Sequence, residues 1–271
     1  MEKINLKKIS IILTMHGLAL ASFGEINKLN FTSWFIAHIL FATLGVSVGY
    51  HRYFSHKSFT PHQMTEKIIA LVSTLCFQGG IITWAAQHRA HHLYSDNHGD
   101  PHSANRGFFW SHMKWMFYDN PNGFTMAAHT KRIRDLTKNN FLVSLNKKSN
   151  LINILFLMSL LVFCFLINRP YLFFWIGPLR IVTVWHLTWL TNSYVHNAHN
   201  QSHLKKPYKK SLFLKIFMGG EGDHEHHHNF QYLATNSYKI SNFDMGFYLI
   251  ELLYKLNLIS SFKLTIITDD K

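Results

Sequence analysis

The sequence predicts an all-α integral membrane protein, with four transmembrane helices in two hairpins, interfacial helices and a cytoplasmic, histidine-rich cap. Of its 271 residues, 48% are hydrophobic and 15% are charged, whereas about 25% of the residues in soluble domains are charged. Long apolar runs alternate with segments rich in His, Lys and Asn. The 27 Lys and Arg residues exceed the 14 Asp and Glu residues, and they lie in loops beside the apolar runs, as is typical of cytoplasmic loops. This placement favours membrane lipids and argues against nucleic acid as a partner.

Two apolar runs near the N-terminus, residues 9–24 and 31–50, predict the first hairpin. The basic start and the sequence Ala19-Leu20-Ala21 also resemble a cleavable signal peptide. We favour a membrane helix because a short polar turn and a second run of spanning length follow, and a bilayer requires about 20 residues. His16 and His38 lie inside these runs. We expect both to be hydrogen-bonded packing residues rather than ligands.

Two further segments are predicted to lie at the membrane surface. Residues 67–84 are apolar but broken by Gly79-Gly80, which indicates an interfacial or re-entrant helix. Residues 245–259 form an amphipathic pattern, which predicts a helix lying on the membrane.

The second hairpin is predicted from residues 151–167 and 171–195, joined by a tight turn at Asn168-Arg169-Pro170. The cytoplasmic cap then comprises residues 51–150 and 196–271. We expect a single domain over residues 1–271, with both termini on the cytoplasmic side.

Histidines recur at helical spacing on the predicted cytoplasmic side. His88, His91 and His92 lie at i, i+3 and i+4, so on a helix they share one face. The same spacing recurs at His224, His227 and His228, whereas His226 points elsewhere and is expected to support a ligand or face solvent. Two pairs complete the set. His51 and His56 can share a site only if their helix ends or bends between them, and Asn192 and His196 are one turn apart.

These nine histidines predict a metal centre with two ions. Imidazole suits iron, zinc, copper and nickel, but a zinc ion takes only about four ligands. Two ions with about five ligands each account for the number, and open six-coordinate sites are what iron prefers in oxygen chemistry. Cys76 and Cys164 lie in apolar runs far apart, so neither a disulfide nor a cysteine-based zinc site is expected.

The histidine motifs resemble those of the membrane fatty acyl desaturases, most closely the stearoyl-coenzyme-A desaturase type. The resemblance rests on HRYFSH (His51 to His56), HRAHH (His88 to His92), NSYVH (Asn192 to His196) and GEGDHEHHH (Gly220 to His228). It implies a centre of two Fe2+ ions held by His51, His56, His88, His91, His92, His196, His224, His227 and His228, with Asn192 contributing through water.

The resemblance also implies a kinked tunnel for a saturated acyl chain. Trp84, Thr188 and Trp189 match positions that line its bend, and Phe35 and Ile39 match positions that close its end. The implied reaction uses dioxygen and two external electrons to introduce a cis double bond, at the delta-9 position. A separate donor of the cytochrome b5, ferredoxin or rubredoxin type is expected to supply the electrons.

The carrier of the acyl chain stays open between coenzyme A and a membrane lipid. Ala86 and Gln87 stand where acyl-coenzyme-A enzymes carry a basic and an acidic residue, and bacterial relatives that act on lipid-linked chains share the plainer pattern. The composition favours a bacterial inner membrane over the endoplasmic reticulum.

Two other functions fit the same motifs. A related di-iron acyl hydroxylase or oxygenase would share the histidines, so only its product distinguishes it. A non-enzymatic metal-binding protein is the second alternative. A transporter would need ionisable residues along a transmembrane path, whereas these histidines gather on one side.

Overall fold

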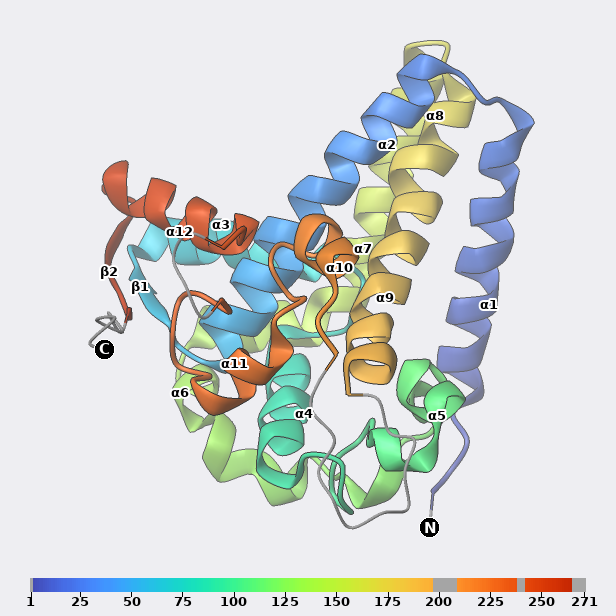
Figure 1. The fold of residues 1–271 in the computed structure, drawn as a ribbon. Coiled ribbons are helices and arrows are strands. Elements are labelled where there is room, and N and C mark those ends of the chain that lie inside the picture. Colours follow the sequence, from blue (N-terminus) through green and yellow to red (C-terminus); the bar gives the residue numbers. More distant parts are fainter. Residues whose placement is uncertain (1, 197–208, 238–241, 265–271) are drawn as a thin grey trace.

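The computed structural model describes residues 2–196, 209–237 and 242–264. Its long helices stand side by side, and the remaining elements gather around one end of this bundle (Figure 1). The predicted cap, residues 51–150 and 196–271, therefore lies partly outside the described residues.

The first two helices form the predicted N-terminal hairpin. Helix α1 spans Leu6–Leu20 and continues as a 3-10 turn, η1, over Ala21–Gly24. Helix α2 spans Lys28–Leu40 and continues as a π-helix, η2, over Phe41–Ser55. The second helix is thus longer than predicted and carries His51 inside its final turns.

The second pair of long helices is built from α7 and a run of four helical segments. Helix α7 spans Asn140–Leu166 and begins 11 residues before the predicted run at residue 151. The following run consists of α8 (Pro170–Phe174), η7 (Trp175–Leu179), α9 (Arg180–Leu190) and η8 (Thr191–Val195), of which η7 and η8 are π-helical.

Three helices in the described part of the chain are long and apolar enough to cross a membrane. They are Leu6–Gly24, Lys28–Ser55 and Asn140–Leu166. The fourth predicted run is helical, but it is not among these three. The structure therefore supports a mostly helical membrane protein.

The remaining elements build the cap. The helices are α3 (Gln63–Thr74), α4 (Ile81–Tyr94), α5 (Phe108–His112), α6 (Arg134–Thr137), α10 (Leu212–Phe217), α11 (His224–Asn229) and α12 (Met245–Lys255). Short 3-10 turns lie at η3 (Ala104–Arg106), η4 (Lys114–Phe117), η5 (Pro121–Gly123) and η6 (Ala127–Ile133). Helix α12 agrees with the amphipathic prediction for residues 245–259.

A two-stranded antiparallel sheet is an addition to the predicted all-α class. Strand β1 (Phe59–Pro61) pairs with β2 (Ile259–Phe262) in the register Phe59 to Phe262 and Thr60 to Ser261. Strands this short give little sequence signal, because their alternation extends over only three or four residues. The pair ties the end of the described chain to the segment that follows η2.

The predicted re-entrant segment, residues 67–84, consists of α3, a turn and α4. Its turn exposes backbone carbonyls, and side chains of the long helices donate to them. Arg180 donates to the Leu75 carbonyl at 2.8 Å, Trp185 to that of Phe77 at 3.0 Å, and Tyr50 to that of Gly79 at 2.6 Å. Non-helical backbone at membrane depth is stable only when buried in protein in this way.

Asn146 of α7 then fixes the start of α4. Its side-chain oxygen accepts hydrogen bonds from the backbone of Ile82 at 2.9 Å and of Thr83 at 3.3 Å. The first N–H groups of a helix have no partner within the helix, so this contact caps α4 from outside. The helix that carries the first histidine triplet is thereby held against α7.

Candidate metal centre

Five of the predicted ligands converge in one cluster, which we call the five-histidine cluster. It consists of His51, His56, His88, His92 and His227, whose candidate ligand atoms all lie within 4.8 Å of one another. Neighbouring Nε2 atoms are 2.8–3.0 Å apart along the row from His56 through His88, His92 and His227 to His51. Helices η2, α4 and α11 thus deliver their imidazoles to one point.

The other four histidines form a second cluster, the four-histidine cluster. It consists of His91, His196, His224 and His228. The Nε2 atom of His228 lies 3.3 Å from that of His91 and 3.1 Å from that of His224. The two triplets on α4 and α11 therefore each divide between the clusters, so that adjacent residues such as His91 and His92 serve different sites.

The spacing of His51 and His56 has a physical explanation that the sequence did not reveal. Hydrogen bonds in a π-helix run from residue i to i+5, so two residues five apart lie one above the other. Because η2 is π-helical up to Ser55, the two rings meet with centroids 5.1 Å apart. The helix ends beside His56, as predicted, but its winding rather than a bend aligns the pair.

The residues fit a pair of metal ions. Ligands about 2.1 Å from an ion at neighbouring octahedral positions are about 3.0 Å apart, which matches the Nε2 separations. His51 and His91 also donate their Nδ1 hydrogens to carboxylates, at 2.9 and 2.8 Å. In the neutral ring, the Nε2 atom then presents a lone pair to the cluster.

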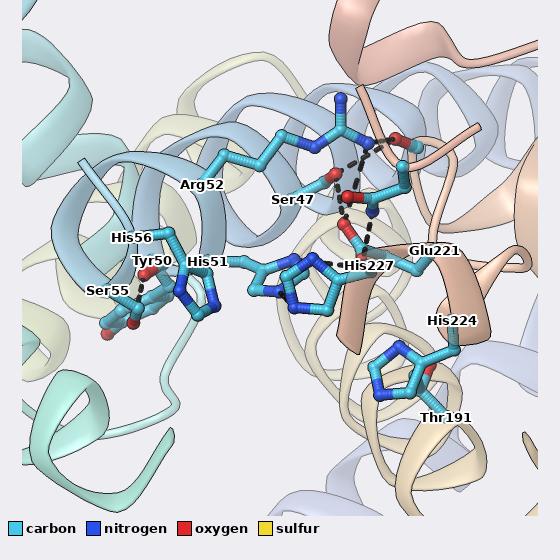
Figure 2. A network of polar contacts seen from close by, with 12 residues as sticks. Ser47, Tyr50, His51, Arg52, Ser55, His56, Thr191, Glu221, His224 and His227 are labelled. Carbon is cyan, nitrogen blue, oxygen red and sulfur yellow. Dashed lines mark hydrogen bonds and ion pairs between the residues drawn. The ribbon is translucent and has the colours of Figure 1, made fainter. Parts of the chain in front are cut away.

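Three carboxylates orient the ligands, and the sequence analysis assigned them no role. Glu221 accepts from His51, Asp100 from His91, and Asp96 from His196 at 3.2 Å. Figure 2 shows the first of these contacts, with His51 lying between Glu221 and His227. Two of the three carboxylates serve the four-histidine cluster. An acidic residue close to a histidine triplet was the available signal for Asp96 and Asp100.

A buried network holds Glu221 in place (Figure 2). Ser47 donates to it at 2.5 Å and Asn236 at 3.1 Å, and the Arg52 guanidinium lies 3.9 Å away. Burial alone would raise the pKa of Glu221, but His51, Arg52 and the Ser47 hydrogen bond lower it below its usual value. Arg52 also pairs with Asp244 at 2.8 Å, which links η2, the helix that carries the candidate ligand His51, to the C-terminal segment.

Metal binding requires neutral imidazoles, and the surroundings of most of the candidate ligands favour that form. Burial, followed by repulsion between neighbouring rings, lowers the pKa well below its usual value for His56, His88, His92, His224, His227 and His228. His91 differs. Burial lowers its pKa, but the charge and hydrogen bond of Asp100 outweigh burial and raise it.

His226 is the one motif histidine that belongs to neither cluster. It is 1% exposed, and its ring packs on Phe230 with centroids 5.1 Å apart. The expectation that it faces solvent is wrong, because α11 is covered on that side as well. The prediction that it points away from the other three histidines of α11 holds.

A cavity of about 440 Å³ leads to the five-histidine cluster. His88 and Asn192 line it, together with the three residues predicted at the bend, Trp84, Thr188 and Trp189. The sequence analysis missed Gln78, which joins two of them by donating to Thr188 at 2.8 Å and accepting from Trp84 at 3.1 Å. The Trp84 ring also stacks on His88, with centroids 5.0 Å apart. The cavity wall is therefore connected directly to a candidate ligand.

Two predicted substrate residues lie elsewhere. Phe35 and Ile39 are not among the described residues that line this cavity, and Phe35 is 39% exposed and packs against Phe217. Their role in closing a tunnel stays a prediction. Gln87 lines the cavity, whereas Ala86 is fully buried.

The two histidines inside the N-terminal apolar runs are hydrogen-bonded at both ring nitrogens, as predicted. His38 contacts the Thr183 hydroxyl at 3.2 Å and the Phe217 carbonyl at 3.1 Å. His16 contacts the Ile12 carbonyl and His186. Neither belongs to a candidate metal cluster.

Comparison with known proteins agrees with this geometry. The model of the family described as fatty acid desaturase matches residues 29–240. The sn-1 stearoyl-lipid 9-desaturase of Synechocystis sp. is 33% identical over 258 residues, which cover 93% of this chain and 78% of the relative. The sn-2 palmitoyl-lipid 9-desaturase of Nostoc sp. is 34% identical over 250 residues, covering 90% and 85%. The stearoyl-CoA desaturase of Homo sapiens is 28% identical over 204 residues, covering 73% and 57%. The chain belongs to the fatty acid desaturase family, and it is an oxidoreductase of that family.

Proposed function

We propose that the chain introduces a cis double bond at the delta-9 position of a saturated acyl chain carried on a membrane lipid. The observation that carries this proposal is the cavity, whose wall combines a candidate metal ligand, His88, with tryptophans suited to an apolar chain. Relatives named as acyl-lipid 9-desaturases match over most of both chains. Coenzyme A remains the second candidate carrier.

We further propose that the two clusters hold two Fe2+ ions. The nine histidines named above would be the ligands, and Asn192 would complete the four-histidine cluster through a water molecule. The support is the donor set, which is all imidazole, and the near-octahedral spacing of the five-histidine cluster. Such a site favours a transition metal over magnesium or calcium, which take oxygen ligands.

Our proposed topology has four spans, with the run from Pro170 to Val195 as the fourth. In Figure 1 this run lies alongside α1, α2 and α7 and ends beside the cap. Four spans place both termini and the metal clusters on one side, which we take to be the cytoplasmic side of a bacterial inner membrane. We also propose a separate electron donor of the cytochrome b5, ferredoxin or rubredoxin type.

The chain's own residues bind and orient the substrate. When bound, the two irons would supply, with dioxygen, the oxidising power needed to remove hydrogen from an unactivated C–H bond. The aromatic wall at Trp84 and Trp189 excludes water and holds the acyl chain, which favours a reactive geometry by reducing its freedom. Gln78 and Thr188 fix the Trp84 ring against His88. A methylene pair at this wall would therefore lie beside the five-histidine cluster.

The carrier assignment rests on Ala86 and Gln87. Ala86 is fully buried and Gln87 is uncharged, so these two positions offer no charged pair to the headgroup of coenzyme A. A lipid ester needs no such pair at this position.

Expression in a host without middle-chain desaturation tests the proposal. We expect new cis-monounsaturated chains that depend on oxygen and accumulate in a membrane lipid class before they appear in the coenzyme A pool. His88→Ala should abolish them. Hydroxy acids instead of unsaturated chains would indicate an acyl hydroxylase, and unsaturation that persists in His88→Ala would refute the metal assignment.

A further inference from the structure

Three histidines outside both metal clusters form a hydrogen-bonded row, which we call the histidine row. It consists of His16 on α1, His186 on α9 and His112 on α5. The Nε2 atoms of His16 and His186 are 3.0 Å apart, and Nδ1 of His186 lies 3.0 Å from Nε2 of His112. The Ile12 carbonyl contacts His16 at 2.7 Å at one end, and the Ser193 hydroxyl contacts His112 at 3.0 Å at the other.

The histidine row is not arranged as a metal site. His186 uses its two nitrogens for two different neighbours, so the lone pairs do not converge on one point. The Ile12 carbonyl can only accept, so in a neutral row His16 donates to it and accepts from His186. His186 in turn accepts from His112, whose remaining nitrogen lies beside the Ser193 hydroxyl, and that hydroxyl donates to the Trp189 carbonyl at 2.9 Å. One order of donors therefore runs from His112 through His186 and His16 to Ile12, and it fixes the orientations of the three rings.

The histidine row lies directly behind Trp189 of the cavity wall. The Trp189 ring centroid is 5.0 Å from that of His186, 5.8 Å from that of His112 and 6.5 Å from that of His16. Trp189 is 3% exposed and lines the cavity, whereas His16, His112 and His186 are not among its lining residues. Aromatic rings at these separations and angles attract one another. The indole is thus held between the row and the space proposed for the acyl chain.

The same row joins three elements that surround the cavity. Helix α1 contributes Ile11 and Ile12 to the lining, and α9 contributes Trp185, Thr188 and Trp189. Helix α5 contacts η8, the segment that contains Asn192. Loss of the row would therefore free the indole and loosen the contact of α1 with α9.

We propose that His16, His112 and His186 are positioning residues that act through Trp189 and determine which carbon pair of the acyl chain is oxidised. This inference rests on the proposed desaturase function. The wall at Trp189 sets how far the chain can slide past the metal ligands, and misplacement by about 1 Å is enough to change a rate on the order of 100-fold. A mobile indole would allow neighbouring carbon pairs to react.

His186→Leu tests the inference, because leucine fills much of the space but breaks both hydrogen bonds of the central ring. His186→Gln is the conservative variant, since its amide still offers one donor and one acceptor. His38→Gln is the matched control. His38 also lies in a proposed span and is hydrogen-bonded at both nitrogens, but its partners are Thr183 and Phe217.

Double-bond positions are measured by mass spectrometry of the lipids, and iron content of the purified enzyme is measured in parallel. In His186→Leu we expect the fraction of displaced double bonds to rise about tenfold, equivalent to about 1.4 kcal/mol, with iron content unchanged. His186→Gln should restore most of the original distribution, and His38→Gln should keep it.

An unchanged distribution in an active His186→Leu enzyme would overturn the inference, as would equal displacement in all three variants. If His186→Leu does not accumulate, His16→Leu takes its place, because it removes only the end of the row and should displace the product in the same direction. Absence of any unsaturated product from the unmodified chain would instead count against the proposed function.

Discussion

Asp100→Asn should release metal from the four-histidine cluster and leave the five-histidine cluster loaded. Asp100 is fully buried and lies 2.8 Å from Nδ1 of His91, and it also accepts from the backbone of Asp96 at 2.9 Å and of His102 at 3.1 Å. Asparagine has nearly the same shape, but it removes the charge that fixes the His91 tautomer. The perturbation is therefore local and electrostatic.

The expected magnitude follows from that one contact. A hydrogen bond to a charged group contributes about 1.5–3 kcal/mol net, which corresponds to about 10- to 100-fold in affinity. Loss of a partner behind a metal-bound histidine typically has an effect of this size. Burial raises the pKa of Asp100, but His91 and His102 outweigh burial and lower it below its usual value, so the carboxylate is charged throughout the useful pH range.

The assay is iron content during dialysis against a graded chelator. At a chelator concentration where the unmodified enzyme still holds two irons per chain, the Asp100→Asn variant should hold one. Glu251→Gln is the control and should match the unmodified enzyme, because Glu251 is a partly exposed carboxylate on α12 that pairs with Lys255 at 3.4 Å. Loss of both irons together, or of neither, would refute the assignment of Asp100 to one cluster.

Three further predictions concern stability and the cavity. The metal-free protein should lose stability as pH falls below about 6.5, because buried histidines with lowered pKa values bind protons only after unfolding. Each such group contributes up to about 1.4 kcal/mol per pH unit, and urea titrations in detergent at pH 7 and pH 5.5 would show no difference if this were wrong. Arg52→Leu should destabilise the fold by about 3–5 kcal/mol, since it leaves Asp244 buried without its partner, and thermal unfolding of the purified protein measures this. Gln78→Leu should lower the turnover rate without loss of iron, because Trp84 and Thr188 lose their bridge, and an unchanged rate would show that the bridge is dispensable.

The sequence predicted the metal ligands more fully than their geometry. Spacing identified the triplets, and the number of histidines predicted a centre with two ions. The resemblance added the family, which the comparisons confirm. All nine histidines lie in two clusters. Spacing did not show that adjacent residues such as His91 and His92 serve different clusters, because the side chains that each face of α4 meets depend on how the other helices pack.

What the sequence could not show comes from tertiary contacts. Residues 41–55 form a π-helix, and α3 packs against it. At Gly45 and Gly49, an added Cβ would collide with Cys76 and Ser73, so α3 approaches the backbone itself. The spacing of Gly45 and Gly49 is the small-residue pattern of closely packed apolar helices, but it does not specify the π-helical winding that brings His51 and His56 together.

The carboxylates and the histidine row have the same origin. Glu221 reaches His51 across 170 residues, and His186 reaches His16 across the same separation in sequence. In the sequence, each of these side chains is an acidic or ionisable residue, and no neighbouring residue indicates which distant side chain it contacts. In the fold, Glu221 holds a ligand toward the metal clusters, while His186 holds Trp189 toward the cavity. The two contacts therefore serve the same proposed reaction in different ways. The contact of Glu221 with His51 orients a ligand of the oxidising centre, whereas the contact of His186 with His16 orients the wall against which the acyl chain lies.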